Sequence, residues 1–146
     1  MSDGRMAPDS RYSSRVGEIR FGEQLVRVTS ATLDLYHLYS ARPGWDLEVH
    51  LDGAVPELML TGTGARPALP GPSPLEVAYL DRPGLVTMDG KPGAIVPVKS
   101  ELEIVELGQG KVRITGTLHT RWTALGEGAV MRAYPIAVDL EAALVT

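Results

Sequence analysis

The segment Glu101 to Arg121 most constrains the fold, because apolar and polar residues alternate on both sides of a glycine-rich break. On the first arm Leu102 and Ile104 alternate with glutamates. On the second arm Val112 and Ile114 alternate with Lys, Arg and Thr. A period of two residues around a Gly-rich turn is typical of a β-hairpin. The segment therefore predicts antiparallel β structure.

The length of the break also predicts how the two arms pair. A three-residue loop that ends at Gly110 would place Leu107 opposite Lys111, and therefore Ile104 opposite Ile114 on the apolar face. Gly110 is expected to have a positive φ, which glycine adopts at little steric cost. Ile104 and Ile114 are accordingly expected to be buried partners.

A second hairpin is predicted from Val16 to Val28, with its turn at Gly22-Glu23. The phase of the alternation changes at Ser30, which indicates a β-bulge or a bend, since side chains in a strand alternate strictly. The segment Asp46 to Asp52 predicts a strand with alternate leucine and valine residues on one face. Further strands are expected at residues 33–39, 57–60, 75–80, 85–88, 94–98 and 134–145.

Proline and glycine mark the segments that should interrupt the sheet. Residues 62–74 are rich in both, and a surface loop is expected there. Pro97 lies inside an apolar run and cannot donate a backbone hydrogen bond. The strand that contains Pro97 is therefore expected at an edge of the sheet.

About eight to ten short strands with Gly- and Pro-containing turns predict an all-β fold, either an antiparallel β-sandwich or a closed β-barrel. The 146 residues suffice for one domain with its own core. Residues 15–146 are expected to form this single all-β domain. Residues 1–14 are mostly polar, and a flexible leader is expected there.

Composition excludes some classes of site and partner. The chain has no cysteine, which excludes disulfides and thiolate metal sites. A net charge of −4 argues against a nucleic-acid surface. No stretch approaches the roughly 20 apolar residues of a membrane helix, and no signal-peptide core is recognisable near residue 1. A cytoplasmic protein without membrane or nucleic-acid partners is expected.

The late strand motif Gly-x-Val-x-Ile-x-Gly-Thr runs from Gly110 to Thr117, and a Phe-Gly turn occurs early, at Phe21-Gly22. In these features the chain resembles small bacterial all-β proteins. The resemblance implies a fold class and carries no activity with it. A preference for arginine over lysine among the 14 basic residues is typical of GC-rich bacterial genomes and agrees with this origin.

Large amphipathic side chains cluster around the turn at Arg42-Pro43-Gly44. Tyr36 and Tyr39 precede this turn, and Trp45 follows it. Tyr, Trp and Arg are common anchors of binding surfaces. A partner surface formed by Tyr36, Tyr39, Arg42 and Trp45 is therefore expected, with a core position for Trp45 as the competing interpretation.

Two constellations could carry chemistry. Glu48, His50 and Asp52 project from one face of a predicted strand and could share a divalent ion. His119 lies in phase with polar residues across the hairpin from Glu101 and could act as a general base. A solvated polar face explains both patterns more simply. No metal, cofactor or catalytic residue is therefore expected.

The sequence leaves several functions open. The favoured hypothesis is a non-catalytic interaction module that binds a protein partner or self-associates, for example as a homodimer. The alternatives are a calycin-like barrel that binds a small apolar ligand and a metal-assisted enzyme using His50. The absence of a Gly-x-Ser-x-Gly elbow and of a proper phosphate-binding loop argues against two common enzyme classes.

Overall fold

A computed structural model describes residues 9–37, 42–51, 58–63, 67–81, 86–88, 90–126 and 130–145. Within these ranges the chain forms ten β-strands. No helix of the described part is long and apolar enough to cross a bilayer. The strands are β1 (Ser10–Phe21), β2 (Gln24–His37), β3 (Pro43–Leu51), β4 (Leu58–Thr63), β5 (Ser73–Leu75), β6 (Tyr79–Asp81), β7 (Val86–Met88), β8 (Lys91–Gly108), β9 (Lys111–Ala124) and β10 (Met131–Leu144).

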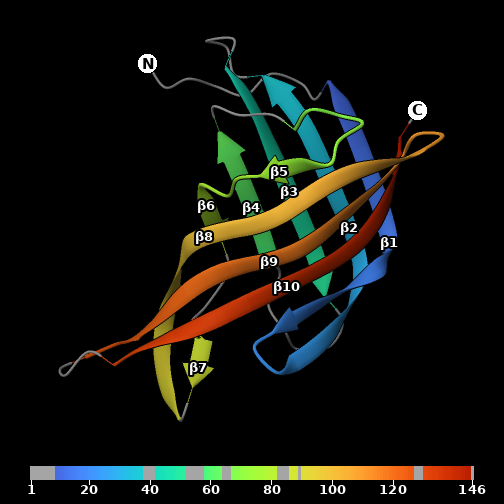
Figure 1. Ribbon diagram of the computed structural model, residues 1–146. Coiled ribbons are helices and arrows are strands. Elements are labelled where there is room, and N and C mark those ends of the chain that lie inside the picture. Colours follow the sequence, from blue (N-terminus) through green and yellow to red (C-terminus); the bar gives the residue numbers. More distant parts are fainter. Residues whose placement is uncertain are drawn as a thin grey trace.

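The strands form one antiparallel sheet in the order β5-β8-β9-β10-β1-β2-β3-β4-β6, and β7 pairs with β8. This sheet curls into a half-barrel, so that β8, β9 and β10 cross in front of β2, β3 and β4 (Figure 1). The prediction of an all-β antiparallel fold is confirmed. A long sheet curls in this way because each strand carries a right-handed twist.

The core lies between the two halves of the curled sheet. It consists of the side chains that point inward and alternate with outward-pointing ones along the strands. Its largest fully buried side chains are Trp45, Trp122, Ile19, Leu33, Leu47, Leu58, Leu60, Leu75, Ile104, Ile114, Leu118 and Ile136. Both tryptophans therefore belong to the core.

The predicted register of the β8–β9 hairpin is confirmed in the body of the hairpin. Ile104 pairs with Ile114, and the two side chains are 0% and 1% exposed. The expected positive φ of Gly110 is also confirmed, at 73°.

The turn itself differs from the prediction. Gly108, not Leu107, pairs with Lys111, so that the loop consists of Gln109 and Gly110. Both loop residues have positive φ, as a type I′ turn requires. The register shift between Glu106 and Gly108 makes Leu107 an extra residue, and this bulge restores the predicted pairing beyond it.

The packing of Ile114 can be tested with the removal of a single methyl group. Ile114→Val should lower the free energy of unfolding by about 0.5–1.5 kcal/mol, because the buried site cannot collapse fully around the gap. Thr115→Ser removes one methyl group from the opposite face of β9. This substitution should change the free energy of unfolding by less than about 0.5 kcal/mol. Urea unfolding of both variants measures the difference. Equal losses would contradict the assigned faces.

The other predicted hairpin is also present. Phe21 pairs with Gln24 around the Gly22-Glu23 turn, which joins β1 to β2. The expected change of phase appears as a register shift between Val28 and Ser30 in the β2–β3 pairing.

Two segments differ from the sequence-based expectation. β1 begins at Ser10 and buries Tyr12 and Ser14, so residues 10–14 belong to the sheet rather than to a leader. Three of these five residues are serines, so no apolar alternation marks this strand in the sequence. The expected loop at 62–74 also contributes strand residues, since β4 extends to Thr63 and Ser73 and Pro74 belong to β5.

The expected edge position of Pro97 is confirmed. On the side of β8 away from β9, β7 pairs with residues 91–93 and β5 with residues 102–104. Among the described residues, no strand pairs with residues 94–101 on that side. A proline and the bulge between Pro97 and Lys99 make this open edge a poor template for a further strand.

Candidate functional site

Two of the four residues expected to form a binding surface are buried. Trp45 is 1% exposed and Tyr36 is 3% exposed. The Tyr36 hydroxyl donates a hydrogen bond to Asp46 Oδ1 at 3.2 Å. Arg42 is exposed, and Tyr39 lies outside the described residues. The surface interpretation of Trp45 is therefore replaced by the core interpretation.

The reason for this burial lies in the strand register. Trp45 shares a face with the inward residues of β3 and stands directly opposite Gly62 on β4. A Cβ atom at Gly62 would lie 2.1 Å from Trp45 Nε1. The indole ring therefore occupies the space that a side chain at Gly62 would need. The Tyr36 ring likewise occupies the space that a side chain at Gly44 would need, since Tyr36 and Gly44 are partners in the β2–β3 register.

The candidate metal ligands are only partly brought together. His50 Nε2 lies 3.3 Å from Glu48 Oε1 on the outer face of β3, and both side chains are nearly half exposed. Asp52 lies outside the described residues. The described part of the chain contains no group of three metal-ligating residues among His, Cys, Asp and Glu.

His119 contacts a carboxylate across the β8–β9 pair. Its Nε2 lies 2.9 Å from Glu101 Oε1, and Lys99 Nζ lies 3.5 Å from the same oxygen atom. The side chains of His119 and Glu101 are 45% and 53% exposed. Water screens charges at a site as exposed as this one.

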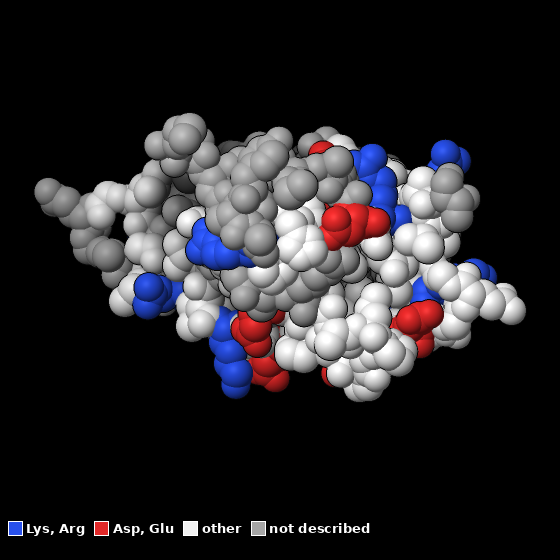
Figure 2. All heavy atoms as spheres, turned by 90° about the horizontal axis from the view of Figure 1, so that it is seen from above, with Lys and Arg blue, Asp and Glu red and all other residues white. Residues whose placement is uncertain are grey.

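Charges of both signs are interspersed on the face of the molecule that Figure 2 shows. Figure 2 looks down on the molecule from the top of Figure 1, and acidic groups lie directly beside basic groups on this face. On this face, charged groups form small mixed clusters rather than one extended field of a single sign.

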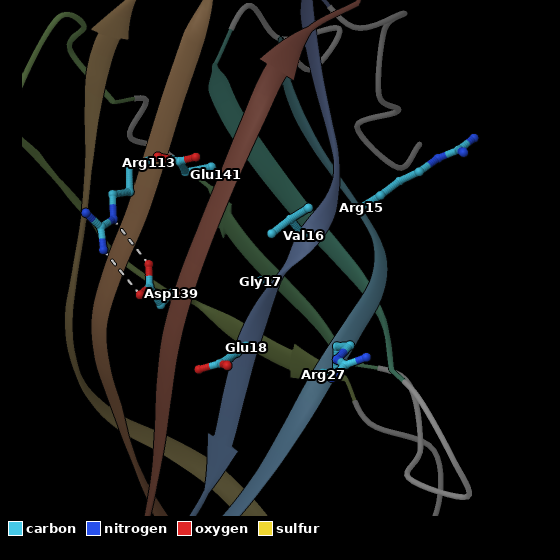
Figure 3. A pocket seen from close by; sticks show the side chains of 8 residues that line it. All are labelled: Arg15, Val16, Gly17, Glu18, Arg27, Arg113, Asp139 and Glu141. Carbon is cyan, nitrogen blue, oxygen red and sulfur yellow. Dashed lines mark hydrogen bonds and ion pairs between the residues drawn. The ribbon is translucent and has the colours of Figure 1, made fainter.

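A hollow of about 530 Å³ lies on the outer face of β9, β10, β1 and β2 (Figure 3). We call it the charged hollow. It is lined by Arg15, Val16, Gly17, Glu18, Arg27, Arg113, Asp139 and Glu141.

An irregularity of β1 shapes the centre of the charged hollow. The pairing of β1 with β10 shifts register between Ser13 and Val16. The Ser14 hydroxyl donates to the Val16 carbonyl at 2.8 Å and accepts from the Val16 amide at 3.1 Å, which holds this bulge. Val16 is consequently pushed outward and is 73% exposed.

A fixed ion pair lies at one side of the charged hollow. Arg113 Nε and Nη2 donate to the two carboxylate oxygens of Asp139, each at 3.2 Å. These hydrogen bonds, followed by the charge of Asp139 itself, raise the pKa of Arg113, and the nearby charge of Glu141 adds to the effect. The bidentate geometry orients both side chains along the sheet.

The other charged groups of this hollow form no ion pair within the described part of the chain. Arg15, Arg27, Glu18 and Glu141 make no ion pair with any residue that the structure describes. Glu18 stands opposite Arg27 in the β1–β2 register, yet their charged groups are not in contact. These four side chains are therefore available to a ligand or partner.

A second hollow, of about 410 Å³, lies on β8, β9 and β10 and is mainly apolar. It is lined by Val98, His119, Thr120, Arg121, Met131, Arg132 and Ala133. Large apolar residues are exposed in and beside it. We call this group the distal patch; it comprises Val96 (44% exposed), Val98 (63%), Leu125 (56%) and Met131 (60%).

On the outer face of the sheet, Arg121 lies among these apolar residues. Arg121 pairs with Val96 on one side and with Ala133 on the other. Arg121 makes no ion pair within the described ranges, and no carboxylate lines this hollow. The surface thus combines a free guanidinium group with exposed apolar side chains.

The sequence pattern did not reveal the distal patch. Val96 and Val98 have even numbers, as do the buried Leu102 and Ile104, so alternation alone assigns all of them to the core face. The bulge between Pro97 and Lys99 reverses the phase and turns the valines outward. Proline inside an apolar strand was the available signal.

Searches of protein-family models, curated proteins and solved structures find no match for this chain.

Proposed function

We propose that this chain is a non-catalytic interaction module that binds a segment of a partner protein at the distal patch. The observation that carries the proposal is the hollow beside Val98 and Met131, which exposes apolar surface next to Arg121. Exposed apolar patches with polar rims commonly mark interaction sites. Met and Arg are also enriched in interfaces relative to other surfaces.

The charges beside the patch indicate the chemistry of the partner. Arg121 has no carboxylate partner in the described part of the chain. A partner segment that places an apolar side chain in the hollow and a carboxylate against Arg121 would satisfy both features. The proposed partner is therefore an acidic peptide segment with an apolar anchor.

The arrangement of the titratable groups supports a module without catalysis. The histidine–carboxylate contacts of His50 and His119 are open to solvent, since the His50 and His119 side chains are 40% and 45% exposed. The apolar-ligand alternative would need a space inside the half-barrel, where the large side chains of the core are packed.

A peptide titration tests the proposed function. The full-length, 15N-labelled protein is titrated with a synthetic peptide that carries leucine between glutamates, and with the same peptide carrying lysines instead. Amide shifts should concentrate at the distal patch, and the acidic peptide should bind about tenfold more tightly. Equal binding of both peptides, or shifts elsewhere, would contradict the proposal.

Substitutions sharpen this test. Arg121→Glu should abolish the preference for the acidic peptide, and Met131→Asp should weaken binding of both peptides. Leu25→Asp is the matched control, since Leu25 is 50% exposed on β2, away from the patch. All three variants should retain the melting temperature of the parent protein.

We also infer that the curled sheet is completed as a barrel rather than as a sandwich. β5 pairs with β8 at one end of the sheet, and β6 pairs with β4 at the other. Only residues 76–78 separate β5 from β6, and the Ala78 amide donates to the Thr61 carbonyl at 2.7 Å. Ser100 Oγ donates to the Leu75 carbonyl on the opposite side. The short segment 73–81 thus bridges both edges, which supports closure.

A further inference from the structure

We propose that a second copy of this chain docks on the charged hollow, and that the two copies form a symmetric dimer through it. The proposal concerns a different face from the distal patch and does not depend on it. It rests on the distribution of charge around the exposed Val16.

The charges of the hollow are separated across the sheet. Arg15 and Arg27 lie on the β1–β2 side, whereas Asp139 and Glu141 lie on β10, with Val16 between the two groups (Figure 3). Glu18 lies close to the centre. Because Arg113 is held by Asp139, the unpaired groups are basic on one side and acidic at the centre and on the other side.

This separation makes the surface complementary to itself. In a dimer with twofold symmetry the same patch meets its own copy, so each contact occurs twice with the roles exchanged. A twofold axis near Val16 would bring Arg15 and Arg27 of one protomer onto Glu18 and Glu141 of its partner. The two exposed valines would meet close to the axis and exclude water from the centre.

A small ionic ligand fits the charged hollow less well. The lining carries Arg15, Arg27 and Arg113 together with three carboxylates, so an anion or a cation would meet like charges at short range. A second copy offers both signs at the matching spacing. The exposed positions of these groups predict a weak dimer that dissociates as ionic strength rises.

A charge-swap experiment tests the dimer with the full-length protein in analytical ultracentrifugation. The parent protein should dimerise at low salt and dissociate at high salt. The variants R15E/R27E and E18R/E141R should each dimerise at least about tenfold more weakly, since every contact then joins like charges. An equimolar mixture of the two variants should restore the dimer, because opposite charges face each other again.

A control variant separates this proposal from a general effect of charge. K91E/R121E changes the net charge as much as R15E/R27E does, but both substitutions lie on β8 and β9, outside the charged hollow. It should dimerise like the parent protein while losing the acidic-peptide preference described above. A monomeric parent protein, or a mixture of variants that remains monomeric, would overturn the inference. So would a dimer that K91E/R121E disrupts and R15E/R27E does not.

Discussion

Trp45→Ala should destabilise the fold by about 3–5 kcal/mol, which is the usual cost of deleting a fully buried large aromatic side chain. Trp45 is 1% exposed and lies among the largest side chains of the core. The neighbouring strands cannot close the gap, because the sheet register fixes their spacing. Urea unfolding followed by circular dichroism measures the loss.

Two control variants attribute this loss of stability to the removal of the Trp45 ring. Trp45→Phe keeps an aromatic ring and should cost clearly less. Tyr79→Ala removes an aromatic residue that is 67% exposed and should change stability by less than about 0.5 kcal/mol. If Trp45→Ala melted like the parent protein, the core position of Trp45 would be refuted and a surface role would have to be reconsidered.

The sequence predicts most of the β-structure because its hairpins are locally consistent. At Ile104 and Ile114 the alternation, the glycine-rich turn and the burial all agree. Because side chains alternate strictly along a strand, this one pair then predicts which face the neighbouring residues of both strands take. The same reasoning placed the change of phase near Ser30 correctly.

The candidate sites were much harder to predict, because single-residue irregularities decide which face a side chain takes. The bulge after Pro97 turns Val98 outward, and the bulge before Val16 leaves this valine exposed at the start of the predicted hairpin of residues 16–28. Neither extra residue is a glycine, although Gly17 directly follows the bulge of β1. Burial of Trp45, in contrast, depends on its pairing with Gly62, seventeen positions further along the chain. Local sequence patterns do not reveal such a pairing.

Glycine has a common role beneath the aromatic residues of this sheet. Gly62 lies under Trp45, Gly93 under Trp122 and Gly44 under Tyr36, and a Cβ atom at any of them would lie within 3.0 Å of the ring. Gly62 and Gly44 stand directly opposite their aromatic partners in the register. A ring that packs against a glycine covers backbone that would otherwise lack side-chain packing.

Gly62→Val should therefore destabilise the fold by about 4 kcal/mol, beyond the usual cost of overpacking. The new Cβ would lie 2.1 Å from Trp45 Nε1 and 2.6 Å from the backbone carbonyl oxygen of Glu76. The indole ring is enclosed by the core, and the carbonyl belongs to the segment that joins β5 to β6, so neither neighbour can move freely. Thermal and urea unfolding should both show the loss.

Two comparisons identify steric contact with Trp45 as the cause. Gly126→Ala places a Cβ in open space at a φ of 103°, so it should cost only about 1–2 kcal/mol of backbone strain. In a double-mutant cycle, Gly62→Ala should cost at least about 1 kcal/mol less when Trp45 is already phenylalanine, because Nε1 is then absent. Additive effects in this cycle would instead assign the cost to the Glu76 carbonyl. In that case the backbone segment between β5 and β6, rather than the indole ring, would be what requires glycine at position 62.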